Sequence, residues 1–78
     1  MASARATVIL YNTRFCRLCE ETEKMLHELG VTPIKIDIVE DEILFEKYHV
    51  RIPVLKREDK NAELAWPYTT ADVKYFLK

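Results

Sequence analysis

The chain has 78 residues, of which 49% are hydrophobic, and its 12 basic residues nearly balance its 13 acidic ones. This length predicts one small domain over residues 1–78, in which we expect residues 1–5 to be flexible. Because the charges are interspersed and the net charge is −1, the composition argues against a nucleic-acid partner. No apolar stretch approaches the length of a membrane span. The first six residues are too short for a secretory signal.

The first half of the chain predicts a strand, a helix and a second strand. Residues 7–11 form an apolar, β-branched run that indicates a buried strand. Apolar or small side chains then recur at helical spacing at Leu18, Thr22, Met25, Leu26 and Leu29. The only glycine, Gly30, stands where this helix should end and suits a left-handed cap. Pro33 opens an alternating segment, residues 34–38, which favours a half-buried strand at a sheet edge.

The second half predicts a short helix, a hairpin and a last helix. Acidic residues 40–42 favour a helix start, and the apolar face of that helix would be Ile43, Leu44 and Tyr48. Residues 53–57 and 62–66 are the expected hairpin strands around a polar turn. Thr69 and Asp72 have the spacing of a capping box, ahead of a helix with Val73, Phe76 and Leu77 on one face. The order β-α-β-α-β-β-α predicts a four-stranded mixed sheet with three helices, an α/β fold.

The two cysteines, Cys16 and Cys19, stand two residues apart at the junction between the first strand and the first helix. A loop this small contributes little as a structural staple. The start of a helix offers unpaired N–H groups and a positive dipole end, which stabilise a thiolate. The thiolate is the reactive form of cysteine, so the position favours a chemical role. The competing interpretation is a pair of buried, inert side chains.

This order resembles the thioredoxin fold, because a C-x-x-C pair lies at the first strand–helix junction and Ile-Pro opens the third strand. Within that fold the chain is similar to the small glutaredoxin-like proteins with a C-x-L-C motif, from about residue 6 to residue 78. The matching segments are residues 11–19, 51–55 and 63–67. The resemblance implies a thiol–disulfide oxidoreductase that serves cell redox homeostasis.

The resemblance also implies roles for the residues at the motif. Cys16 would be the exposed nucleophile and Cys19 the more buried resolving thiol. Arg14 and Arg17 flank Cys16, where they would favour its thiolate and contact substrate. The alternative for both arginines is that they are solvated surface charges.

Three further residues enter the expected substrate site. Pro53 corresponds to a cis-proline beside the dithiol, which would leave the backbone of Ile52 free to pair with an extended substrate. Thr69, at the start of the last helix, could receive a carboxylate. Typical glutaredoxins carry Pro-Tyr between the cysteines and a glycine pair before the last helix that holds part of glutathione. This chain has Arg-Leu and residues 66–70, Trp-Pro-Tyr-Thr-Thr, in those places.

The expected partners follow from this chemistry. No bound cofactor or metal is needed, and the substrate would be a protein or low-molecular-weight disulfide. Glutathione as a cosubstrate, or a thioredoxin-type reductase, would return the electrons. We expect a monomer without membrane or nucleic-acid partners, in the reducing cytoplasm. The alternative compartment is the mitochondrion or another organelle.

A function from a different class stays open beside this one. It is a non-catalytic thioredoxin-fold module that binds a protein or a metal. His27 and His49 are spaced from the cysteines in no common zinc pattern. A metal site shared by two chains, each giving one C-x-x-C, stays open as well.

Overall fold

Residues 7–78, the part of the chain that the computed structural model describes, form four strands and three α-helices. The bounds, including one 3₁₀ turn η1, are β1 (Val8–Asn12), α1 (Arg17–Glu28), β2 (Ile34–Asp37), η1 (Ile38–Glu40), α2 (Glu42–Tyr48), β3 (Val54–Arg57), β4 (Ala62–Ala65) and α3 (Thr70–Phe76). The predicted order β-α-β-α-β-β-α is confirmed. The expectation for residues 1–5 falls outside the described residues.

The strands form one mixed sheet in the order β2-β1-β3-β4. β1 runs parallel to β2, with Tyr11 opposite Ile36, and antiparallel to β3, with Tyr11 opposite Val54. β3 and β4 pair as an antiparallel hairpin. β2 is an edge strand, as the proline before it predicts. Ile34, at the start of this strand, is 54% exposed, whereas Ile36 is partly buried against the cluster around Tyr11.

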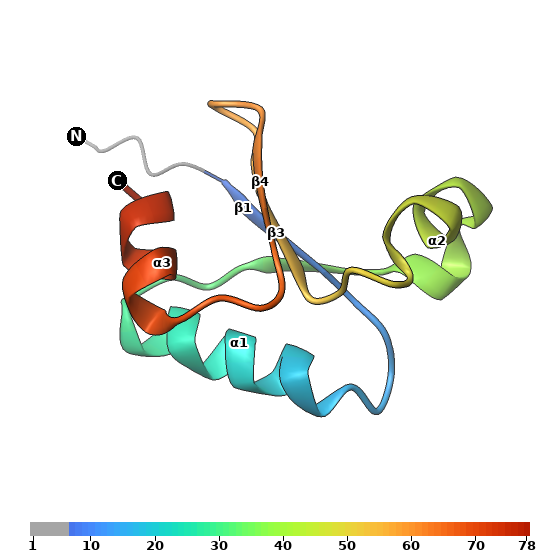
Figure 1. Cartoon of the computed structure of the whole chain (residues 1–78), viewed down its shortest axis with the longest axis horizontal. Helices are drawn as coiled ribbons and strands as arrows, with labels where there is room; N and C mark the ends of the chain where they lie inside the picture. Colours follow the sequence, from blue (N-terminus) through green and yellow to red (C-terminus); the bar gives the residue numbers. More distant parts are fainter. Residues whose placement is uncertain (1–6) are drawn as a thin grey trace.

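The alternation along β1 divides the core between the two faces of the sheet. Leu10 packs with Leu26 of α1 and Val73 of α3 on one face. Tyr11 packs with Tyr48 of α2 on the other. Figure 1 shows the same division, with α1 and α3 close together and α2 at the other end of the molecule from α3. Successive side chains of a strand point to opposite faces, so one strand serves both clusters.

The helix ends follow the chemistry expected of them. Gly30, directly after the last turn of α1, has a φ of 80°, the left-handed conformation predicted for it. α3 begins with a complete capping box, in which Asp72 N–H donates to Thr69 Oγ1 at 3.1 Å and Thr69 N–H donates to the Asp72 carboxylate at 2.9 Å.

Ile43 departs from the predicted apolar face of α2, because it is 77% exposed. The seven residues of α2 present only Leu44 and Tyr48 to the sheet.

Arg57 at the end of β3 joins the hairpin to the end of α3. Its side chain is buried and donates through Nε and Nη2 to the Asp59 carboxylate, at 3.0 and 2.7 Å. Its Nη1 donates to the backbone carbonyls of Phe76 and Lys78. A cation at a helix C-terminus meets the negative end of the helix dipole. The sequence patterns did not reveal this contact, since it joins residues about twenty positions apart.

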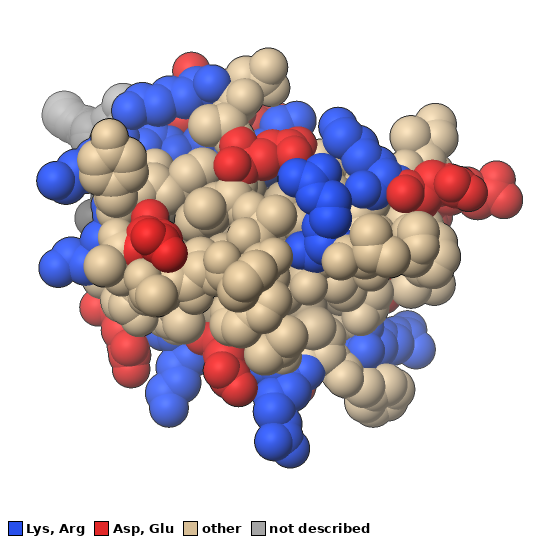
Figure 2. Space-filling model, viewed as in Figure 1, with Lys and Arg blue, Asp and Glu red and all other residues tan. Residues whose placement is uncertain are grey.

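The surface carries both signs of charge. Figure 2 shows lysines, arginines and acidic residues scattered around the viewed face, with an uncharged region at its centre. Neither sign dominates this face. Within residues 7–78, no helix has the length and apolar character needed to cross a membrane.

Candidate active site

Cys16 and Cys19 lie at the start of α1 and are joined by a disulfide. Cys16 is the N-cap residue, with extended backbone angles, and Cys19 lies in the first turn of the helix. Their Cα atoms are 5.2 Å apart, within the range that a disulfide spans. The structure therefore shows the oxidised form of the dithiol.

The two cysteines differ in burial. Cys19 is 3% exposed, whereas Cys16 is only partly buried. A nucleophilic thiol must be reached by its substrate, and a resolving thiol needs to reach only its partner sulfur. The asymmetry is in the direction that the resemblance implies.

The N-cap position also supplies a donor to the Cys16 sulfur. Cys19 N–H donates to Cys16 Sγ at 3.1 Å, and a hydrogen bond to the charged form of a group favours that form. The helix dipole acts in the same direction. Arg14 and Arg17, which lie close to Cys16 in the sequence, are both exposed. Neither forms an ion pair with an acidic side chain of residues 7–78.

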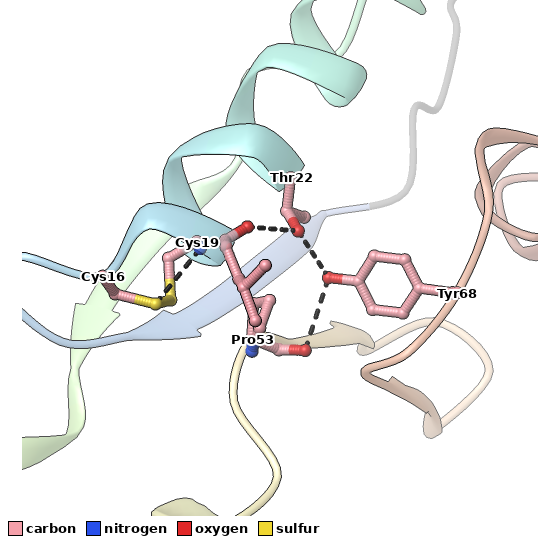
Figure 3. The surroundings of a disulfide bond; sticks show 6 residues. Cys16, Cys19, Thr22, Pro53 and Tyr68 are labelled. Carbon is pink, nitrogen blue, oxygen red and sulfur yellow. Dashed lines mark hydrogen bonds between the residues drawn. A yellow bond between two sulfur atoms is a disulfide. The ribbon is translucent and has the colours of Figure 1, made fainter.

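Pro53 meets the expectation for its geometry. The Ile52–Pro53 peptide bond is cis, and Figure 3 shows Pro53 in the surroundings of the disulfide. One of the two polar backbone groups of Ile52 already has a partner, which corrects the expectation that this backbone would be free to pair with a substrate. Its N–H donates to the Tyr48 carbonyl at 3.1 Å, because the turn after α2 folds back on that carbonyl. Within residues 7–78 no group donates to the Ile52 carbonyl, so this oxygen is what an extended substrate could use.

Two buried hydroxyl groups connect the cysteine helix to the proline segment. Thr22 Oγ1 lies 3.0 Å from the Leu18 carbonyl and 2.8 Å from the Tyr68 hydroxyl, which is itself 3.3 Å from the Pro53 carbonyl (Figure 3). The two hydroxyls carry one proton each, so only two of these three contacts can be full hydrogen bonds at the same time. The Pro53 carbonyl also accepts from Trp66 N–H at 3.2 Å. This Thr22–Tyr68 link holds α1, the start of β3 and the segment before α3 together.

Burial raises the pKa of Tyr68 to about 12, so its hydroxyl stays protonated and able to donate. The sequence patterns placed Thr22 on the buried face of the helix, which the structure confirms at 0% exposure. Tyr68 is 6% exposed, so its ring is part of the core and does not line an open groove. A threonine among apolar helix positions was the available signal that a polar partner would face it.

Thr69 does not present free groups to a carboxylate. Its hydroxyl accepts from Asp72 N–H and its own N–H donates to the Asp72 side chain. A ligand would have to displace Asp72 from both. The helix that follows has only seven residues. The structure therefore gives no support to Thr69 as a substrate-binding residue.

The histidines lie in ordinary surroundings. His27 is exposed on α1, and His49 stacks on the Phe45 ring with Nδ1 2.8 Å from the Phe45 carbonyl. Among the described residues, 7–78, no three His, Cys, Asp or Glu side chains are grouped so that they could hold a metal ion.

A C-x-x-C pair at the N-terminus of α1, beside a cis-proline in a mixed sheet of this order, defines a thioredoxin-fold protein of the glutaredoxin-like class. The family model described as "Glutaredoxin-like domain (DUF836)" matches residues 7–78. The chain belongs to this family.

Solved structures agree with the fold. Protein XcR50 from X. campestris superimposes with a TM-score of 0.82 at 26% identity, over 91% of this chain and 95% of that one. Protein Ne2328 from Nitrosomonas europaea superimposes with a TM-score of 0.83 at 24% identity, over 100% of this chain and 98% of that one. No curated protein matches the chain.

Proposed function

We propose that the protein is a glutaredoxin-like thiol–disulfide oxidoreductase in which Cys16 is the nucleophile and Cys19 the resolving thiol. The observation that carries this proposal is the Cys16–Cys19 disulfide at the start of α1, with one cysteine accessible and the other buried. Membership of the glutaredoxin-like family supports it.

The reaction runs through two exchanges of disulfide bonds. The Cys16 thiolate attacks one sulfur of the substrate disulfide, that bond breaks, and the other substrate sulfur leaves as a thiolate. The Cys19 thiolate then attacks Cys16 Sγ, which releases the second substrate sulfur and leaves the Cys16–Cys19 disulfide. Two electrons have moved from the protein to the substrate. A thiol donor, either glutathione or a thioredoxin-type reductase, returns them and restores the dithiol.

The surroundings contribute to binding and to thiolate stability. The Cys19 amide and the start of α1 stabilise the Cys16 thiolate. Arg14 and Arg17 add positive charge at the same end of the helix, and the Ile52 carbonyl beside Pro53 accepts from a substrate amide. In this proposal the protein works as a monomer, without a bound cofactor, in the cytoplasm or in an organelle whose thiol pool is reducing.

The first experiment equilibrates the Cys16–Cys19 dithiol against a graded glutathione redox buffer. We expect a reversible intramolecular disulfide with a potential of about −270 to −200 mV, as in thioredoxin and glutaredoxins. Cys19→Ser should then trap a stable mixed disulfide on Cys16. Failure to form the disulfide, or protection of both thiols by added zinc, would instead favour the non-catalytic binding module.

A further inference from the structure

Phe15, directly before Cys16, is in an unfavourable conformation and an unfavourable environment together. Its φ is 57°, in the left-handed region where glycine is at ease and a bulky side chain is strained. Its side chain is 99% exposed, the largest exposure among the large hydrophobic residues of the described chain. Folding gains nothing from this ring, because it contacts no core residue.

The residues next to Phe15 are also of types that are unfavourable for stability at their positions. Arg17 is the first residue of α1, where the positive end of the helix dipole disfavours a cation. Leu18 after it is 37% exposed. Arg14 is exposed and, like Arg17, has no acidic partner within residues 7–78. Residues that are unfavourable for stability and cluster beside a reactive group are typical of a functional site.

We propose that residues 14–18 are a docking segment that selects disulfides of proteins, with Phe15 packing against an apolar side chain next to the substrate cysteine. Arg14 and Arg17 attract a carboxylate on the same partner segment. The proposal rests on the proposed oxidoreductase function and names its substrate class. The occupant is a chain segment that carries a cysteine in a disulfide, an apolar neighbour and an acidic residue.

The apolar side chain beside the cysteine, and not the charge, separates this substrate from glutathione disulfide. Glutathione carries carboxylates, so the two arginines attract it as well. It has no apolar side chain beside its cysteine, so Phe15 has nothing to cover. The preference for a protein disulfide must therefore come from the ring, and the charge alone would not produce it.

The test compares three disulfides as oxidants of the reduced protein. Two are disulfide-linked peptides that are identical except for Leu or Ser beside the cysteine, each with one Glu, and the third is glutathione disulfide. We expect the wild-type protein to react faster with the Leu peptide than with the Ser peptide. Phe15→Gly should slow the Leu peptide by roughly tenfold, the effect of one partly buried aromatic ring. The loss with glutathione disulfide should be several times smaller.

Controls separate docking from folding and from thiol reactivity. Phe15→Gly relieves the left-handed strain, so its Tm should rise by about 4–8 °C, and the iodoacetamide rate of reduced Cys16 should stay at the wild-type value. Phe15→Leu should keep the preference for the Leu peptide. Tyr75→Ala removes another exposed aromatic ring, 77% exposed on α3, and should leave the preference intact.

Two results would overturn the docking role, namely an equal loss on all three disulfides or a wild-type protein without preference between the two peptides. A wild-type protein that reduces none of the three would instead refute the proposed function itself.

Discussion

At the scale of single residues, the two cysteines have the same chemistry and different surroundings. Cys16 lies at the N-cap, partly exposed, while Cys19 is buried in the first turn. In the reduced protein we expect iodoacetamide to modify Cys16 much faster than Cys19 below neutral pH, because only Cys16 combines access with a stabilised thiolate. Mass spectrometry of the partly alkylated protein measures the ratio. Equal, slow labelling of both would remove Cys16 from the role of nucleophile.

The arginines beside the motif are open to a separate test. Replacing Arg14 and Arg17 together by Ala should slow alkylation of Cys16 by a few-fold below neutral pH, since two nearby cations are lost from the thiolate. Both side chains are exposed, so solvent screens them and the effect stays small. Lys24→Ala with Lys74→Ala removes the same charge from exposed sites elsewhere and should leave the rate unchanged. An unchanged rate in the arginine variant would leave the helix terminus and the Cys19 amide as the cause.

At the scale of elements, the Thr22–Tyr68 link fixes the cysteine helix to the segment that precedes α3. Tyr68→Phe removes one hydroxyl and leaves Thr22 with only its local carbonyl, so we expect a loss of about 1–2 kcal/mol in the free energy of unfolding. Urea unfolding measures it. Thr22→Val in the Tyr68→Phe background should cost less than Thr22→Val alone, because the partners are removed together. Tyr75→Phe, at an exposed site, should lie within about 0.5 kcal/mol of wild type. A fully additive pair would show that the hydroxyls are not coupled.

The same scale shows how far sequence patterns reach. The order of elements, the edge position of β2, Gly30 as a cap and the capping box of α3 were all predicted, because each depends on residues close together in the chain. The position of Cys16 and Cys19 at the junction of the first strand and the first helix was predicted for the same reason. The exposure of Ile43 was missed, since a seven-residue helix meets the sheet along one narrow line. The Thr22–Tyr68 contact joins residues 46 positions apart, and only the assembled sheet brings them together.

At the scale of the whole molecule, the buried Arg57 guanidinium connects two elements that lie far along the chain from the dithiol. Arg57 joins the hairpin to the last turn of α3 through carbonyls of Phe76 and Lys78, and Asp59 balances its charge. A buried guanidinium is tolerated only where every donor is satisfied and a counter-charge is present. The contact between the hairpin and the end of α3 therefore includes an ion pair whose acidic member, Asp59, is exposed in the hairpin turn.

We expect this ion pair to make the stability depend on pH. The hydrogen bonds from Arg57 hold the pKa of the Asp59 carboxyl below its ordinary value of 3.8. A lowered folded-state pKa means that the stabilisation is fully present above that ordinary value and is lost as the pH falls through the folded pKa. Asp59→Asn should therefore be less stable than wild type at pH 7, and the two should converge in acid. Glu58→Gln, at the neighbouring exposed turn position, should follow the wild-type curve in thermal unfolding across the range. A constant difference between Asp59→Asn and wild type at every pH would mean that the contact acts through hydrogen bonding alone, without the charge.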